Sequence, residues 1–190
     1  MRERAPEGGR SQAAGKAGLR LFFALWPDDA VRDALAAWAR ELHRACGGRT
    51  TRPQNLHVTL AFLGDTDGGR LPELKAAAGS VAPRAFELVL DRPGYWKHNR
   101  IAWAGASETP EALQAMVVDL RAALGAAGFR FDEKPFVSHV TLLRKGNSPR
   151  ALPRLDPIVW RGCGFTLIRS VPGAEGSDYA VEAEWRAAEG

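Results

Sequence analysis

Apolar positions along the first third of the chain predict a strand, a long helix and a second strand. The apolar and aromatic run 19–27 ends at a proline and predicts a buried strand. After a cap at Asp28 or Asp29, apolar residues recur at helical spacing as far as Cys46, where a Gly-Gly pair follows. Residues 56–64 then read as a strand. This order places a long amphipathic helix directly before the second strand.

The middle of the chain adds a short helix and two strands. The Ala-rich stretch 69–82 favours a shorter helix, and residues 86–94 and 100–105 predict two strands joined by an aromatic and basic loop.

The same order then returns. Thr109 is the expected N-cap of a second long helix, with Pro110 at its first position, and Gly128 marks the end of its apolar stripe. Residues 134–146 predict the strand that follows. A connection rich in proline and arginine leads to two final strands, about 158–169 and 178–185. Each half of the chain thus supplies a long helix followed by a strand.

The tetrapeptide HVTL occurs in both of these strands, 82 positions apart. The repeat predicts an α+β fold: two pseudo-twofold lobes, with two antiparallel sheets lining a central cleft and helices on the outside. We expect residues 19–190 to form this single domain. Residues 1–18 lack periodicity and are expected to be a disordered leader.

Strand alternation gives each HVTL segment a polar face and an apolar face. His57 and Thr59 share one face of the first strand, and His139 and Thr141 share one face of the second. One such segment alone is typical of an ordinary strand. Packing would preserve the Val and Leu positions without repeating His and Thr, so the doubled polar face indicates a ligand bound by both strands.

Two imidazoles with neighbouring hydroxyls suit an in-line displacement at phosphorus. One histidine can act as general base while the other, protonated, acts as general acid. The threonine hydroxyls can donate hydrogen bonds to phosphate oxygens. A metal site that uses the same histidines is the competing interpretation. It lacks evident further ligands, because no Asp, Glu or Cys sits at zinc-like spacing beside either motif.

Composition limits the function classes only mildly. The net charge is +4, half of it within the first 18 residues. This charge is compatible with an anionic ligand but does not indicate a protein that coats nucleic acid. Cys46 and Cys163 form no CxxC pair and no zinc spacing, and we interpret them as small hydrophobic residues. With no signal sequence or long apolar run, a cytoplasmic protein without a membrane partner is expected. A monomer is expected because no long coiled or uncovered apolar helix is evident.

The two motifs lie in a longer resemblance. The segments LRLFFAL, NLHVTLAFLG, AWAG, LGAAGF and KPFVSHVTLLR, in this order, resemble the 2H phosphoesterase superfamily. The nearest branch is that of the bacterial and archaeal RNA 2′,3′-cyclic phosphodiesterases, also described as 2′-5′ RNA ligases. The resemblance covers residues 19–185. It implies a bilobal α+β fold and hydrolysis of RNA ends that carry a 2′,3′-cyclic phosphate to 2′-phosphomonoesters, with no metal or cofactor.

The resemblance also implies roles for the motif residues. His57 would be the proton donor to the departing 3′-oxygen, and His139 the proton acceptor that activates water. Thr59 and Thr141 would hold the phosphate oxygens. A pseudo-symmetric site gives no independent reason to assign donor and acceptor, so these two roles depend on the resemblance alone.

The chain departs from the family pattern beside both motifs. Arg52 precedes Pro53 where the family often has an aromatic residue, and Ser138 stands where a proline often precedes the second histidine. Neither change touches the four motif residues, but both are expected to alter how the substrate enters.

Two further residues are candidates for substrate binding. Arg144 follows His139 by five positions, where the family tends to carry a basic residue, but strict alternation would direct it away from His139 unless the strand ends or bulges. Phe22 is either a core residue or a surface on which a nucleobase stacks. The loop 95–98, Tyr-Trp-Lys-His, is a candidate RNA contact or simply a solvated loop.

Other activities remain open for the same residues. The substrate could be another cyclic nucleotide, a cyclic ADP-ribose phosphate or a 2′-5′-linked oligoadenylate, and ligation would be the reverse reaction. A non-catalytic RNA-binding module that retains the cleft is the alternative from a different class.

Overall fold

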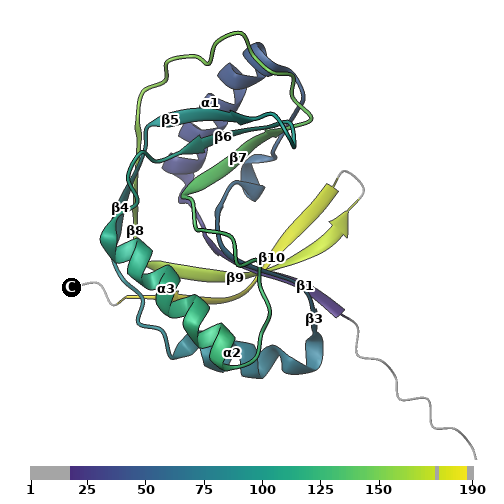
Figure 1. Ribbon diagram of the computed structural model, residues 1–190, viewed down its shortest axis with the longest axis vertical. Helices are drawn as coiled ribbons and strands as arrows, with labels where there is room; N and C mark the ends of the chain where they lie inside the picture. Colours follow the sequence, from purple (N-terminus) through teal and green to yellow (C-terminus); the bar gives the residue numbers. More distant parts are fainter. Residues whose placement is uncertain (1–17, 174–175, 188–190) are drawn as a thin grey trace, which may run out of the picture.

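The computed structural model describes residues 18–173 and 176–187 (Figure 1). Its elements follow the order β1 (Gly18–Leu25), α1 (Asp29–Cys46), β2 (Arg49–Thr50), β3 (Val58–Asp67), α2 (Leu71–Gly79), β4 (Phe86–Leu90), β5 (Arg92–Trp96), β6 (Ile101–Gly105), α3 (Glu111–Ala126), β7 (His139–Arg144), β8 (Ile158–Gly162), β9 (Gly164–Gly173) and β10 (Gly176–Arg186). Residues 1–17 of the predicted leader lie outside the described residues, and Gly18 already belongs to β1.

One eight-stranded antiparallel sheet contains both HVTL segments. Its order is β10-β9-β1-β3-β7-β6-β5, with β2 also paired to β7, while β4 and β8 form a separate two-stranded sheet. We call β1, β3, β9 and β10 the His57 half, and β2, β5, β6 and β7 the His139 half. Within the sheet, a single pair of residues joins the two halves: Val58 of β3 is paired with Val140 of β7. The predicted α+β class, with antiparallel strands and outer helices, is confirmed.

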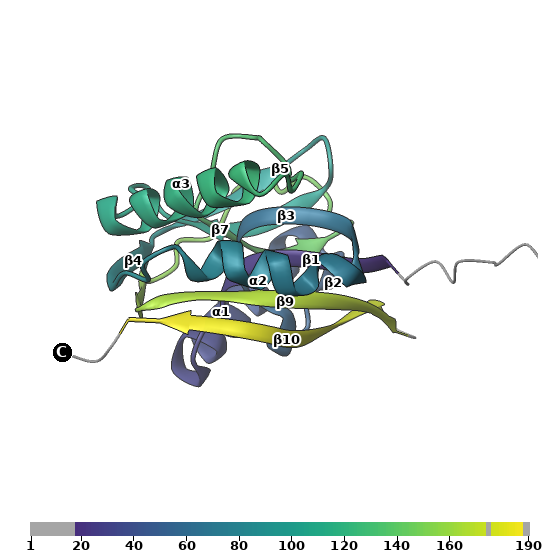
Figure 2. The same cartoon turned by 90° about the horizontal axis from the view of Figure 1, so that it is seen from below.

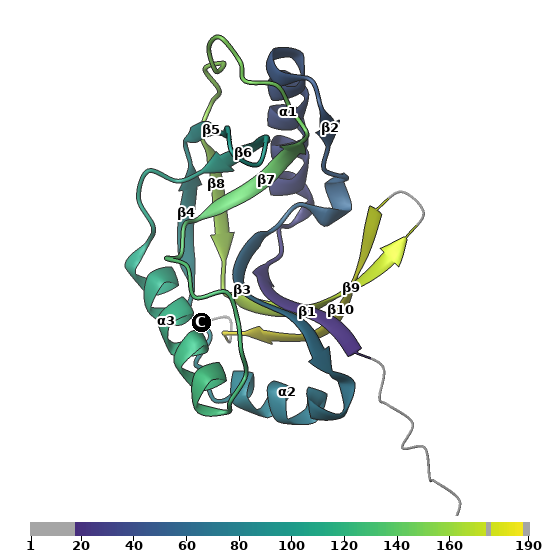
Figure 3. The ribbon, with the colours of Figure 1, turned by 45° about the vertical axis from the view of Figure 1, so that its right-hand side comes forward.

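The helices cover the outer sides of the two halves (Figures 1 and 3). Helix α1 packs against β6 and β7 of the His139 half, whereas α3 packs against α2 and β3 of the His57 half. Figure 2 shows α2 and α3 on one side of the molecule and α1 on another. Helix α1 precedes the first motif in sequence but packs against the His139 half. Helix α3 precedes the second motif but packs against the His57 half.

The apolar stripes predicted for the long helices are buried. Asp28 caps α1, since its carboxylate accepts a hydrogen bond from the Val31 amide at 2.8 Å. In α3 the buried residues are Leu113, Met116, Val117, Leu120 and Leu124. They join one core cluster that extends through both halves and includes the motif residues Val58 and Val140. The core thus anchors the apolar face of each HVTL segment.

Three sequence predictions about elements are wrong in detail. Residues 86–94 form two strands in different sheets, separated at Asp91, whose carboxylate accepts hydrogen bonds from the Ser107 amide and hydroxyl. The strand predicted for 158–169 is likewise divided at Cys163 into β8 and β9. Thr109 does not cap α3, because its hydroxyl is hydrogen-bonded to the Ser138 hydroxyl at 3.0 Å instead.

None of the helices within the described ranges is long and apolar enough for a membrane crossing.

Candidate active site

The two HVTL segments meet at the centre of the sheet. Val58 and Val140 are paired and fully buried, so the alternate residues of both segments face the other side. There, both histidines and both threonines of the motifs line one cavity of about 780 Å³. Antiparallel register places His57 across from Thr141, and Thr59 across from His139. The predicted juxtaposition of the four side chains is present.

Both imidazoles are anchored in the same way. The Nδ1 atom of His57 lies 2.6 Å from the Asn55 carbonyl oxygen, and that of His139 lies 2.8 Å from the Val137 carbonyl oxygen. A carbonyl can only accept, so Nδ1 carries the proton in each ring. A neutral ring then has its lone pair on Nε2, the nitrogen available to the cavity. This tautomer suits a base, and protonation of Nε2 makes the same ring an acid.

Aromatic rings surround His57. Its ring centroid lies 4.9 Å from that of Phe22 and 5.4 Å from that of Tyr179, and the Trp26 ring is stacked on it at 5.9 Å. The His57 Nε2 atom lies 3.1 Å from the Thr59 hydroxyl. We call Phe22, Trp26 and Tyr179 the aromatic cage of His57. The cage fixes the ring and shields the sides that it covers from water.

Tryptophan side chains support His139. The Trp96 ring meets the imidazole edge-on at 4.7 Å, and Trp103 packs behind Trp96 at 5.3 Å. The Trp103 indole lies over Gly94 and Gly105, where a Cβ atom would come within 2.0 and 2.5 Å of its ring. Glycine at these two positions therefore makes room for the aromatic floor beneath His139.

The two surroundings shift the pKa values of both histidines in one direction. Burial lowers the pKa of His57 from 6.5 to about 4; the hydrogen bond to Asn55 opposes the shift, and the positive charges of Arg144 and His139 add to it. Burial also lowers the pKa of His139, opposed by its bond to Val137 and assisted by Arg144. Both rings are therefore predominantly neutral near pH 7 when no anion is bound.

A β-bulge brings Arg144 to the cavity. In β7, Thr141 pairs with Trp103 and Leu143 pairs with Ala102, so Leu142 is an extra residue. The extra residue reverses the alternation, and Arg144 lines the same cavity as His139. The condition stated from the sequence, that the strand must bulge, is met.

An equivalent bulge follows the first motif. In β3, Thr59 pairs with Ala24 and Ala61 pairs with Phe23, which leaves Leu60 as the extra residue. Phe62 then lines the cavity five positions after His57, as Arg144 does after His139. The repeat therefore extends past HVTL to a sixth position, filled by an aromatic ring in one half and by a guanidinium in the other.

The cavity is strongly basic. Arg20, Arg49, Arg52 and Arg144 line it, and its described lining includes no Asp or Glu. The Arg52 guanidinium donates to the Ser177 carbonyl and to the Asp178 carboxylate, each at 2.6 Å, which ties the segment before His57 to β10. Arg20 lies 5.0 Å from the centroid of the Phe62 ring. Such a lining favours an anion with several oxygens.

Two predicted roles were open for Phe22 and for the 95–98 loop, and their surroundings in the structure bear on both. Phe22 lines the cavity but is only 3% exposed and packs against His57 and Tyr179, which favours support of the imidazole over stacking on a base. The Tyr95 hydroxyl donates to the Gly146 carbonyl, whereas Lys97 and His98 are exposed.

Sequence reasoning missed the cage residues Trp26 and Tyr179 and the arginines other than Arg144. Arg20 had a usable signal, because alternation places it on the same face as Phe22. Tyr179 had none, since it reaches the site from the far end of the chain.

Neither a metal cluster nor a cysteine nucleophile is evident in the described residues. No group of three or more His, Cys, Asp and Glu side chains gathers there that could hold a metal ion. Burial raises the pKa of the Cys46 thiol, and neither Cys46 nor Cys163 lines the cavity. The chemistry available in the cavity is that of imidazoles, hydroxyls and guanidinium groups.

Comparison with known proteins identifies the family. Residues 25–103 and 105–160 match the family described as LigT-like phosphoesterase. The RNA 2′,3′-cyclic phosphodiesterase of Escherichia coli strain K12 is 32% identical over 134 residues, which are 70% of this chain and 76% of that protein. That of Thermus thermophilus is 32% identical over 176 residues, 86% of this chain and 87% of the relative.

Solved structures agree with the sequence relatives. The crystal structure of E. coli LigT in complex with 3′-AMP superposes with a TM-score of 0.79 at 29% identity, covering 90% of this chain and 99% of that one. The resemblance inferred from the paired motifs is confirmed. The chain belongs to the LigT-like phosphoesterase family.

Proposed function

We propose that this protein hydrolyses the 2′,3′-cyclic phosphate at the end of an RNA to a 2′-phosphomonoester, without a metal ion. The observation that carries the proposal is the pair of Nδ1-anchored imidazoles that line one arginine-rich cavity, each across the sheet from a threonine. The names of the E. coli and Thermus relatives, and the binding of 3′-AMP by E. coli LigT, support this substrate class.

In the proposed reaction His139 is the proton acceptor and His57 the proton donor. Water attacks phosphorus as its proton passes to Nε2 of His139, and the bond from phosphorus to the 3′-oxygen breaks on the opposite side. Nε2 of His57 gives its proton to that oxygen. The products are a 2′-phosphate and a 3′-hydroxyl. We assign the two roles by the family resemblance.

The threonines and Arg144 would stabilise the charge that develops on phosphorus oxygens. Thr59 and Thr141 flank the two rings and offer hydroxyl donors, and Arg144 adds a fixed positive charge from the bulge of β7. Hydrogen bonds that strengthen as the oxygens gain charge lower the barrier rather than merely binding substrate.

The low pKa of His57 defines when it can act as the donor. In the ligand-free protein the ring is neutral at pH 7. A cyclic phosphate bound between Arg144 and the histidines brings a negative charge that favours the protonated ring. His57 would therefore take up its proton together with the substrate, and a half-buried imidazolium with a low intrinsic pKa gives that proton up readily.

One assay tests the proposal. An oligoribonucleotide that ends in a 2′,3′-cyclic phosphate is incubated with the protein in EDTA, and the product is identified by its mass and by its response to enzymes that remove 3′- but not 2′-phosphates. We expect a 2′-phosphate. A 3′-phosphate would contradict the proposed bond cleavage, and loss of activity in EDTA would restore the metal hypothesis. Tight binding without any product would favour the non-catalytic RNA-binding module.

A further inference from the structure

Arg121 of α3 contacts the first HVTL segment and the segment that leads to the second. It does not line the arginine-rich cavity, but it lines a neighbouring cavity of about 420 Å³ together with Thr59 and His139. Its Nε and Nη2 atoms donate to the Leu60 carbonyl at 3.1 and 3.0 Å, and its Nη1 atom donates to the Lys134 carbonyl at 2.8 Å. Leu60 directly follows Thr59, and Lys134 lies in the segment that leads to His139. One guanidinium thus connects the chain beside the first motif with the chain that approaches the second.

The Leu60 carbonyl belongs to the residue that the bulge of β3 leaves without a partner on β1. A half-buried carbonyl without a hydrogen bond is costly, and a bulge held by nothing can slip by one residue. In the second motif the equivalent carbonyl, that of Leu142, accepts from the Thr51 amide at 2.8 Å. A backbone amide stabilises one bulge, and the Arg121 side chain stabilises the other.

The connection matters because the sheet itself joins the two halves weakly. Beyond the pair Val58–Val140, β3 and β7 share no further paired residues. Thr59 stays opposite His139 only if β3 and β7 keep the same register beyond the Val58–Val140 pair. We propose that Arg121 is a positioning residue for the reaction: it ties the Leu60 bulge to the Lys134 segment and so fixes Thr59 relative to His139.

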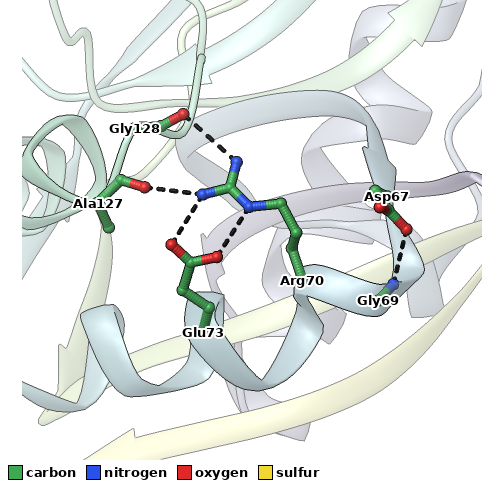
Figure 4. Close-up of polar contacts among 6 residues, drawn as sticks. All are labelled: Asp67, Gly69, Arg70, Glu73, Ala127 and Gly128. Carbon is green, nitrogen blue, oxygen red and sulfur yellow. Dashed lines mark hydrogen bonds and ion pairs between the residues drawn. The ribbon is translucent and has the colours of Figure 1, made fainter.

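Arg70 provides a comparison elsewhere in the fold, where its guanidinium also donates to the Glu73 carboxylate at 2.8 and 2.9 Å (Figure 4). Its guanidinium donates to the Ala127 carbonyl at 2.8 Å and to the Gly128 carbonyl at 3.5 Å, and it lies 4.0 Å from the Phe129 ring centroid. Arg121 likewise holds two backbone carbonyls, with its guanidinium 5.9 Å from the Phe131 ring. Both arginines fasten α3 to neighbouring segments, but Arg70 acts at its C-terminal end, away from the cavity.

The kinetic test, which rests on the proposed function, compares Arg121→Met with Arg70→Met on the cyclic-phosphate oligonucleotide. For Arg121→Met we expect kcat to fall by about 10- to 100-fold with KM changed less than about 3-fold, because a displacement of about 1 Å at a catalytic group has such an effect. For Arg70→Met we expect a lower melting temperature and an unchanged kcat. Arg121→Lys, which keeps a donor, should recover part of the rate and covers the case in which the methionine variant does not fold.

A second readout needs no activity. The imidazole nitrogen resonances of both histidines are recorded in the wild type and in the two methionine variants. We expect the His139 resonances to shift in Arg121→Met and to stay in place in Arg70→Met. If the wild type hydrolyses nothing, the proposed function fails while this spectrum still tests the positioning role. Equal loss of kcat in both variants, a rise in KM at constant kcat, or unmoved His139 resonances would overturn the proposal.

Discussion

The same six-residue pattern, HVTL and the two residues after it, is built into two different environments in the two halves of the sheet. His57 lies inside an aromatic cage and contacts the hydroxyl of its own Thr59, whereas His139 meets one tryptophan edge. The backbone anchors of the two rings are alike. The difference between the halves is therefore one of solvation and charge, not of tautomer.

The sixth position of the pattern carries the second difference. The bulge presents Phe62 beside His57 and Arg144 beside His139. A guanidinium binds phosphate oxygens, whereas a phenyl ring does not. Duplication supplies two equivalent imidazoles, and the residues around each copy separate their chemistry. An acid and a base can thus arise from one motif used twice.

Removal of either imidazole should have the largest effect. We expect His57→Ala and His139→Ala each to lower kcat by about 10³-fold or more, because each ring carries out a proton transfer that the other cannot replace. The double variant should lose little more than the worse single one, since the pair acts as a unit. His43→Ala, on the exposed side of α1, is the control and should keep wild-type rates. Near-normal activity in either single variant would contradict a paired mechanism.

Arg144→Met should have the next largest effect. We expect kcat/KM to fall by about 10- to 100-fold through the lost contact to the phosphate. Because the Arg144 charge lowers the pKa of both histidines, its removal should raise both values, and the rate profile should move to higher pH. Arg144→Lys keeps the charge and should leave both pKa values low. NMR titration of the imidazoles measures the shifts, and unmoved values in Arg144→Met would refute the electrostatic link.

Opening the aromatic cage should affect one half only. In Trp26→Ala the stacked ring is replaced by water, so the pKa of His57 should rise toward 6.5 while that of His139 stays. We expect a loss of several-fold in kcat, because the imidazole is less firmly held. The same NMR titration provides the internal control, since both rings are observed in one sample. A parallel rise in both values would mean that the cage does not distinguish the halves.

The smallest expected effect concerns stability. The folded-state pKa of His57, about 4, lies below its unfolded value of 6.5, so the unfolded chain binds the proton more readily. The contribution of the neutral ring is fully present above pH 6.5 and is lost as the pH falls toward 4. As the pH falls across that range, the unfolding free energy of the wild type should drop by roughly 1–3 kcal/mol more than that of His57→Gln. Urea denaturation at pH 4.5 and 7 measures it, and identical pH dependence in the two proteins would contradict the low pKa.

Local periodicity predicts which side chains share one face of a strand or helix, and this part of the site could be predicted from the sequence. Alternation within a strand assigned the His and Thr side chains to one face and the buried valines to the other, because that depends on neighbouring residues alone. The helix stripe of α3 was predictable for the same reason. The doubled motif then indicated that the two faces share one cavity.

The remainder depends on contacts between distant segments. Arg144 reaches the cavity only because β6 pairs around Leu142, and Thr109 gives up its capping role to a hydroxyl 29 residues away. Tyr179 and Arg121 arrive from β10 and α3. The bulges and the cage are thus properties of strand pairing, which a single segment does not encode.

A substrate with sulfur in place of the 3′-bridging oxygen tests the asymmetry between the histidines most directly. A thiolate leaves without a proton, so such a substrate bypasses the general acid but still needs the base. Single-turnover rates are compared for the wild type, His57→Ala and His139→Ala on the sulfur-containing and ordinary cyclic ends, in EDTA. We expect the sulfur substrate to restore most of the rate to His57→Ala and none to His139→Ala. Rescue of His139→Ala, with His57→Ala still inactive, would contradict the assignment and make His139 the donor.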